Sequence, residues 1–150
     1  MHSQPSDSAE LGDLFHAAFR GLRRTWAEQL SPWELTPHQW RALMTLMRRG
    51  PASSAPAPGD PMRLKDLAER LRIVPRSATE VVDQLEVKGL VRRDPDPTDR
   101  RATLVAATPA GQQLFAKVSA ERRGKSSEYF ARLSAEDRAE LARILGQLGD

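Results

Sequence analysis

The chain has 150 residues, no cysteine and a formal net charge of +3, and its positive charge comes almost wholly from arginine. This length suits one domain, and the absence of cysteine excludes disulfides, thiolate metal sites and cysteine redox switches. No apolar run reaches the roughly 20 residues of a membrane span, and the start MHSQPSDSAE lacks the regions of a signal peptide. We therefore expect a cytoplasmic protein with no membrane partner. Arginine suits bidentate phosphate and guanine contacts, which hints at nucleic acid.

A long helix is expected after a flexible tail at residues 1–10, and Ser31 and Pro32 end it. Its apolar residues recur at steps of three and four, which places them on one helical face. They are Leu14, Phe15, Ala18, Phe19, Leu22 and Trp26.

A second helix is predicted from Thr36, Pro37 and Gln39, which stand where an N-cap, an N1 proline and a capping-box partner belong. The segment 51–61, PASSAPAPGDP, has four prolines and no large apolar residue. This composition indicates an exposed connecting loop.

Two short helices across a tight turn follow the loop. Apolar spacing predicts a helix from Leu64 to Leu71, residues 72–74 form a break, and Pro75 begins a helix that ends at Gly89. This arrangement predicts a helix-turn-helix.

A β-hairpin is expected next. Leu90 and Val91 resume as a strand, RRDPDPTDRRA turns, and residues 103–107 return as a second strand. A hairpin attached to a helix-turn-helix is called a wing.

Two further helices complete the chain, and their start signals are Thr108 with Pro109 and Ser134 with Asp137. The first helix and the last two are amphipathic and need a partner surface, so we expect homodimerisation through both termini. The predicted fold is mainly α, a winged helix-turn-helix with a two-stranded β wing and a terminal-helix dimerisation region. Its expected regions are a tail at 1–10, dimerisation helices at 11–35 and 109–150, and a DNA-binding region at 36–108.

The run LKDLAERLRIVPRSATEVVDQLEVKGLVRRDPDPTDRRATLVAATPAG, residues 64–111, resembles the winged helix-turn-helix core of MarR-type transcriptional regulators. LTPHQWRAL, residues 35–43, resembles the start of their second helix. The likeness covers about half of the chain by motif and nearly all of it by element order. It implies a homodimeric regulator, usually a repressor without enzymatic activity or cofactor, that binds a near-palindromic operator in double-stranded DNA. It also implies release by a small, often aromatic or phenolic, anionic effector.

The outward face of the 75–89 helix carries candidate DNA-binding residues. Arg76 suits guanine or phosphate, and Ser77 and Thr79 suit phosphate or base edges. Gln84 suits adenine. An ordinary solvated helix face is the alternative, which the preceding turn and the following wing make less favoured.

The wing carries a second candidate set, because Asp99, Arg100 and Arg101 match the family's Asp-x-Arg signature. The resemblance implies that one arginine enters the minor groove or holds a phosphate, while Asp99 fixes its neighbour's guanidinium. The negative potential of a narrow minor groove favours arginine.

The chain departs from the family's pattern around the turn. Members commonly have a glycine in the turn and a serine or threonine cap, whereas this chain has Arg72 and Val74 before Pro75. Glu80 stands where many members carry a basic residue.

Two alternatives to a ligand-controlled regulator remain. One is a nucleoid or replication accessory protein that binds DNA without ligand control. The other is a metal-dependent enzyme that uses the cluster Asp94, Asp96 and Asp99. The flanking arginines and prolines argue against the enzyme, because they form a tight hairpin tip in which the arginines already neutralise the carboxylates. No further group stands nearby to complete a catalytic set.

Effector candidates follow from the position of the family pocket, between the terminal helices and the winged domain. They are Phe19, Arg23, Trp33, His38 and Trp40. Their aromatic faces and cation suit a phenolic carboxylate. Core packing is the favoured alternative for Phe19 and Trp40.

Overall fold

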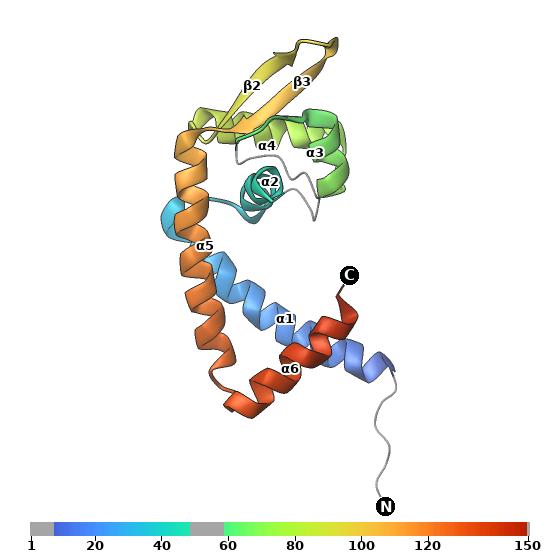
Figure 1. The fold of residues 1–150 in the computed structure, drawn as a ribbon, viewed down its shortest axis with the longest axis vertical. Coiled ribbons are helices and arrows are strands. Elements are labelled where there is room, and N and C mark those ends of the chain that lie inside the picture. Colours follow the sequence, from blue (N-terminus) through green and yellow to red (C-terminus); the bar gives the residue numbers. More distant parts are fainter. Residues whose placement is uncertain (1–7, 49–58, 150) are drawn as a thin grey trace, which may run out of the picture. The chain divides into compact units, whose positions relative to one another are not determined.

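The computed structural model describes residues 8–48 and 59–149, which fold into two compact units. One unit contains residues 30–119, and the other combines the chain up to residue 29 with the chain from residue 120. In order, the elements are α1 (Ser8–Leu30), the 3-10 helix η1 (Ser31–Trp33), α2 (Pro37–Met47), β1 (Met62–Arg63), α3 (Leu64–Leu71), α4 (Pro75–Val87), β2 (Val91–Asp96), β3 (Asp99–Ala107), α5 (Pro109–Phe130) and α6 (Ala135–Leu148) (Figure 1). The fold is mainly helical, as the sequence predicts. No helix in the described ranges is long and apolar enough to cross a membrane.

The unit of residues 30–119 is a winged helix-turn-helix. Three helices, α2, α3 and α4, contact one another and the sheet, and they surround one apolar core. The α4 residues Ala78, Val82 and Leu85 are fully buried in it, as the helical spacing predicts. Trp40 of α2 is 2% exposed and stacks on Phe115 of α5 with ring centroids 5.4 Å apart. The core therefore fixes the positions of both helices of the helix-turn-helix.

The wing is longer than the sequence predicts. The expected turn RRDPDPTDRRA is mostly strand, because β2 runs to Asp96 and β3 begins at Asp99. Strand β3 lies in the centre of the sheet, so β2 is an edge strand and tolerates Pro95, which has no backbone donor. The register shifts between Pro95 and Asp96. The sequence therefore predicted a turn where the chain forms an edge strand that contains a proline.

A third strand, β1, was not predicted. Met62 and Arg63 pair with Val105 and Leu104 of β3 to give the order β1-β3-β2. Two residues are too few for a detectable alternating pattern. Of the predicted loop 51–61, only residues 59–61 lie within the described ranges.

Helix starts agree well with their predicted caps. Thr36 and Gln39 form both hydrogen bonds of a capping box, and Ser134 Oγ accepts from the amide of Asp137 at 3.1 Å. Helix α1 begins at Ser8, so the last part of the expected tail is helical, and residues 1–7 lie outside the described ranges.

The junction between the wing and α5 depends on Thr108 and Gly111. Thr108 Oγ1 donates to the carbonyl of Gly89 at 2.6 Å and accepts from the amide of Gly111 at 3.1 Å. A Cβ atom on Gly111 would lie 2.1 Å from the Leu90 carbonyl oxygen. Gly89 itself has a φ of +73°, in the left-handed region that favours glycine. The close approach therefore requires glycine at position 111, and the backbone conformation favours it at position 89.

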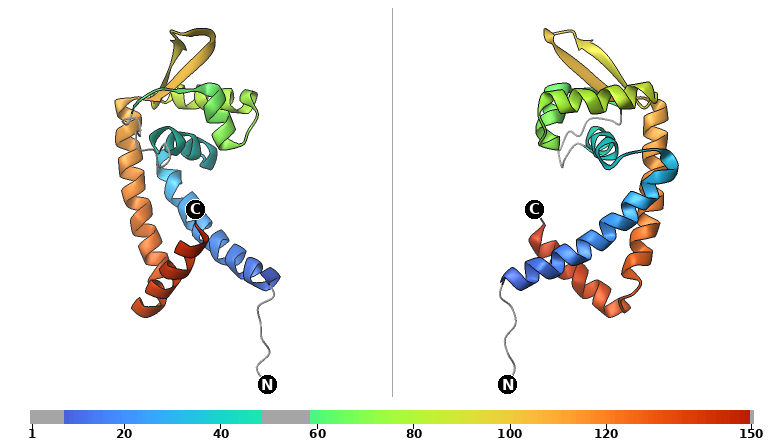
Figure 2. Two further views of the ribbon diagram at one scale, coloured as in Figure 1. Left: turned by 45° about the vertical axis from the view of Figure 1, so that its right-hand side comes forward. Right: turned by 180° about the vertical axis from the view of Figure 1, so that it is seen from behind.

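The second unit joins α1 to the end of α5 and to α6. Tyr129 donates to the carbonyl of Ala18 at 2.7 Å, and Trp26 Nε1 donates to Ser126 Oγ at 3.1 Å. These bonds set α1 antiparallel to α5. After residues 131–134, α6 turns back from the end of α5 (Figure 2).

We expect Gly111→Ala to lower the free energy of unfolding by about 1–3 kcal/mol, because the new methyl group overlaps a backbone carbonyl that cannot move freely. Urea denaturation measures the change. Gly124→Ala is the matched control on the same helix, because its Cβ meets nothing within 4 Å. It should be neutral or stabilising by up to about 1 kcal/mol. Equal stabilities for the two variants would contradict the close approach.

Candidate nucleic-acid interface

Helix α4, the second helix of the helix-turn-helix, begins without a side-chain cap. Val74 occupies the N-cap position with no side-chain hydrogen bond, and Pro75 is the first helical residue. Arg72 ends α3 with a φ of +56°, a conformation that glycine adopts more easily. The two departures in sequence therefore leave α4 without a side-chain cap and place a non-glycine residue in the left-handed region. Other contacts must hold α4 in place.

One flank of α4 is tied to the wing by Arg93 of β2. Its guanidinium lies 2.6 Å from an Asp83 carboxylate oxygen and donates two hydrogen bonds, of 3.1 and 3.3 Å, to Glu86. The hydrogen bond from Arg93 holds the pKa of Glu86 below its usual value, and the same bond raises the pKa of Arg93. The sequence analysis missed this clamp, because it joins residues seven and ten positions apart on two different elements.

The other flank of α4 is tied to α2 by Gln39. This buried side chain donates from Nε2 to Gln84 Oε1 at 2.9 Å, and its Oε1 accepts from Lys88 Nζ at 2.9 Å. Lys88 also donates to the backbone carbonyl of Glu34. Helix α4 is therefore held by polar contacts on both flanks.

The predicted DNA-binding residues of α4 differ in exposure and in the hydrogen bonds that they already form within the protein. Arg76 is exposed, and Ser77 and Thr79 are half-buried. Thr79 Oγ1 donates to the carbonyl of Pro75 at 3.0 Å, whereas its oxygen can still accept. Gln84 is exposed, but its carbonyl oxygen is already bonded to Gln39.

In the wing, Asp96 and Asp99 organise the tip of the hairpin. Asp96 is buried, bonds the amide and hydroxyl of Thr98 at 2.8 Å, and lies 3.0 Å from Arg63. The Thr98 hydrogen bonds, and then Arg63, hold the pKa of Asp96 below its usual value. Asp99 differs from the expectation, because its carboxylate accepts from the backbone amide of Arg101 at 2.9 Å. Asp99 shapes the chain there, and the carboxylates of the wing that pair with a guanidinium are Asp94 and Asp96.

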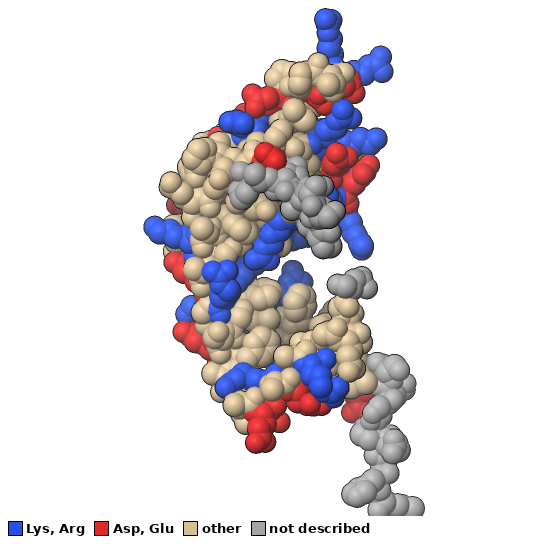
Figure 3. Space-filling view, in the orientation of Figure 1, with Lys and Arg blue, Asp and Glu red and all other residues tan. Residues whose placement is uncertain are grey.

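Arg100 and Arg101 are exposed at the start of β3. Figure 3 shows basic side chains projecting from the top of the view, where Figure 1 places the hairpin of β2 and β3. Within the described ranges, Arg76, Arg100 and Arg101 form no ion pair. Their charges are available to an external anion.

The three aspartates of the wing contact different partners. Asp94 lies 3.3 Å from the Arg92 guanidinium, and Asp96 is occupied by Thr98 and Arg63. Among the described residues, which include all three aspartates, no group of three metal-ligating side chains is found. The three carboxylates therefore have separate partners and are not grouped as the metal-dependent alternative requires.

The five effector candidates fall in both units. Trp40 is a core residue, so the packing alternative is the better description of it. Trp33 is half-buried with Lys117 Nζ 5.5 Å from its ring centroid, and His38 is exposed. In the other unit, the Arg23 guanidinium lies 5.8 Å from the Phe19 ring centroid.

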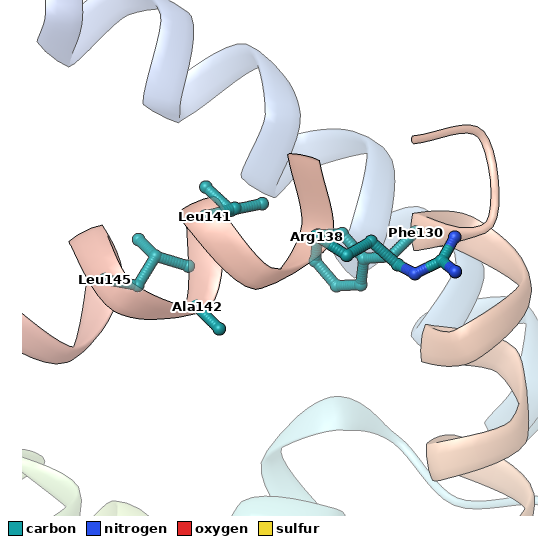
Figure 4. Close-up of a pocket in the computed structure, with 5 residues that line it drawn as sticks. All are labelled: Phe130, Arg138, Leu141, Ala142 and Leu145. Atoms are coloured by element: carbon teal, nitrogen blue, oxygen red, sulfur yellow. The ribbon is translucent and has the colours of Figure 1, made fainter. Parts of the chain in front are cut away.

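The unit of terminal helices contains apolar hollows. Phe19 lines one of about 190 Å³, together with residues of α5 and α6. A neighbouring hollow of about 240 Å³ is lined by Phe130, Arg138, Leu141, Ala142 and Leu145 (Figure 4). Sequence periodicity placed these side chains on helical faces but could not show that they leave space between them.

Comparison with known proteins agrees with this architecture. The family model described as MarR matches residues 35–103. The chain is 26% identical to the HTH-type transcriptional repressor MdtR of Bacillus subtilis, over 88% of this chain and 79% of that protein. The crystal structure of the transcriptional regulator PA4135 is 30% identical, with a TM-score of 0.65, over 97% of this chain and 96% of that one. The MarR family protein Rv2887 of Mycobacterium tuberculosis, solved with p-aminosalicylic acid, is 26% identical, with a TM-score of 0.71, over 93% of this chain and 98% of that one.

The chain belongs to the MarR family. It is a sequence-specific DNA-binding transcriptional regulator with a winged helix-turn-helix. In this MarR protein the matched segment contains both flanks of α4 and the wing clamp, so the family assignment and the candidate interface concern the same residues.

We expect Arg93→Gln to lower the urea midpoint at pH 7, because it leaves Asp83 and Glu86 without their shared cation. The pKa of Glu86 is lower in the folded protein than the ordinary value of 4.5. The stabilisation of the folded state by the pairing of Arg93 with Glu86 is therefore complete above pH 4.5. It is lost as the pH falls through the folded pKa. The difference between wild type and variant should therefore shrink below pH 4.5.

Arg92→Gln is the matched control for this measurement. Arg92 is the adjacent arginine, and its pair with Asp94 has both side chains more than half exposed, so its loss should change the midpoint little at any pH. A constant difference between wild type and Arg93→Gln from pH 7 down to pH 3 would contradict the assigned ion pair.

Proposed function

We propose that this MarR-family regulator is a homodimeric repressor that binds a near-palindromic operator through α4 and the wing. The observation that carries the proposal is the set of three exposed arginines, Arg76, Arg100 and Arg101, on two elements that Arg93 joins. Helix α4 would enter the major groove, and the wing would contact the backbone or the minor groove. Ser77, Thr79 and Gln84 would supply further contacts along α4.

A role in repression is supported by the relatives. MdtR of Bacillus subtilis is a transcriptional repressor by name. A repressor acts by occupying an operator, which requires only binding. We therefore infer regulation by binding and no enzymatic activity.

Homodimerisation is supported by the apolar face of the terminal helices. On α1, Leu11, Leu14 and Phe15 are each more than half exposed, and Leu148 of α6 is 76% exposed. Several large apolar side chains exposed on one unit favour a protein interface over contact with water. A second copy of the same chain would cover them symmetrically, and its twofold axis would match a near-palindromic site.

We infer a small aromatic anion as the effector that releases DNA. The solved structure of Rv2887 contains p-aminosalicylic acid, an aromatic carboxylate. In this chain, Phe19 offers an aromatic face beside the Arg23 guanidinium, and Phe15 stacks on Phe19 at 6.3 Å. A cation next to an aromatic face suits that chemistry. Trp33 and His38 stay candidates by position.

The competing proposal is a nucleoid or replication accessory protein that binds DNA without ligand control. Competition between a selected operator and random DNA separates the two, because an accessory protein should bind both equally. An operator preference of about a thousandfold or more would support the regulator.

We expect Arg101→Ala to weaken operator binding and to lower the slope of log affinity against log salt by about 1, the loss of one phosphate contact. Its thermal stability should match wild type, because Arg101 is exposed and forms no ion pair within the described ranges. Arg24→Ala removes the same charge from an exposed site on α1 and serves as control. Wild-type affinity for Arg101→Ala in a fluorescence anisotropy titration would remove the wing contact from the proposal.

We expect the chain to sediment as a dimer at micromolar concentration and Leu14→Asp to sediment as a monomer, because a charge would replace an apolar side chain in the interface. Val74→Asp is the control, since Val74 is also exposed, at 64%, but lies outside the terminal helices. Aspartate is a favourable N-cap residue there. A monomeric wild-type chain would rule out the proposed dimer.

A further inference from the structure

The acidic residues of α4 differ in their partners. Asp83 and Glu86 both pair with Arg93 of the wing. Glu80 is exposed, and within the described ranges, which include the whole of α4, it forms no hydrogen bond or ion pair. Glu80 therefore places an unpaired negative charge on the helix that is proposed to lie against DNA.

Glu80 lies in the middle of the outward face of α4. Residues three and four positions apart share a face of a helix, so residue 80 is one turn from both Asp83 and Gln84. Asp83 is held toward the wing by Arg93, and Gln84 is held toward α2 by Gln39. Residue 80 falls between these two flanks, on the side opposite the buried face of the helix.

The place of Glu80 along the helix also suits a contact with bases. A recognition helix contacts base edges with the residues near its N-terminus, and Glu80 is the sixth of the 13 residues of α4. Arg76 lies one turn earlier on the same face and is exposed as well. When α4 enters a major groove, the Glu80 carboxylate therefore faces the floor of the groove.

The chemistry of a carboxylate limits what it can contact there. An ionised carboxylate only accepts hydrogen bonds, and phosphate oxygens offer it no donor and repel its charge. In the major groove, guanine and thymine present acceptors, whereas cytosine and adenine present an amino group. The adenine amino group lies beside the N7 acceptor, but cytosine presents its N4 donor without an acceptor. Cytosine is therefore the base that suits a carboxylate best.

We propose that Glu80 is a specificity-determining residue that accepts a hydrogen bond from cytosine N4, so that each operator half-site carries cytosine at one position. The inference rests on the proposed function, because it requires α4 to enter a major groove. The carboxylate lowers the affinity for any duplex by repelling phosphate, and the hydrogen bond offsets this effect only where cytosine faces Glu80. Glu80 thus favours the operator mainly by weakening binding to other sequences.

Selection of operators from a random DNA library with the purified protein tests the proposal. The wild type should select cytosine at one position per half-site, and Glu80→Ala should lose the preference at that position alone. Thymine in place of this cytosine should weaken wild-type binding about fivefold or more and should affect Glu80→Ala little. The variant should fold, because Glu80 is exposed and alanine is the most favourable helix residue.

Two further measurements separate a base contact from a structural role. Glu80→Ala should bind random DNA more tightly than the wild type, because a charge that repels phosphate has been removed. Glu80→Gln should prefer adenine at the same position, since an amide has both a donor and an acceptor. Glu28→Ala removes the same charge from an exposed site on α1 and, as the matched control, should leave every base preference unchanged.

Several results would overturn the inference. If the wild type selects no sequence, the proposed function fails and the inference fails with it. If the wild type selects an operator but Glu80→Ala changes no position, or changes one that carries a base other than cytosine, only the present inference fails. Weaker binding of Glu80→Ala to all DNA alike would show a structural role instead.

The remaining alternative is that Glu80 acts through Arg76 by orienting its guanidinium. Arg76→Ala distinguishes this role from a direct contact, because the two residues would then affect the same base. Loss of preference at one shared position in both variants would overturn the cytosine contact. Separate positions for Arg76→Ala and Glu80→Ala would support it.

Discussion

Bracing on both flanks of α4 is the constraint on which the interface depends. The helix is 13 residues long and starts without a side-chain cap, and isolated helices of this length are marginal in water. Its buried face is apolar, and apolar contacts have no preferred direction. They hold the helix against the core but constrain its rotation about its own axis less strongly. The ion pairs of Arg93 on one side and the hydrogen bonds of Gln39 on the other supply directional contacts. Together they determine which side chains of α4 face outward.

The same contacts explain how a region of nearly balanced charge can present a basic surface. Arg93 pairs with Asp83 and Glu86, and Arg63 pairs with Asp96. These acids lie inside the DNA-binding region and would otherwise repel phosphate. Arg76, Arg100 and Arg101 form no ion pair in the described ranges, so their charges remain for an external anion although the net charge of the chain is only +3.

The sequence predicted what depends on local signals and missed what depends on tertiary contacts. The capping box at Thr36 and the tight turn before Pro75 are local, and both were predicted correctly. The wing strands were underestimated because prolines are ordinarily turn residues, and their tolerance in an edge strand depends on the order of the sheet. The roles of Arg93 and Gln39 depend on partners from other elements, so no spacing rule applied to one helix could have found them.

Lys88 gives the Gln39 network its single orientation. A pair of glutamine amides without a charged neighbour can exchange donor and acceptor ends at little cost, because each amide is nearly symmetric in shape. The ammonium group removes that symmetry, since the exchanged arrangement would place the NH₂ group of Gln39 against three N–H donors and lose the Thr36 capping bond. Lys88 is in turn held by the Glu34 carbonyl, just before α2. The orientation of the Gln84 amide is thus determined by a backbone carbonyl and a lysine that lie on other parts of the unit.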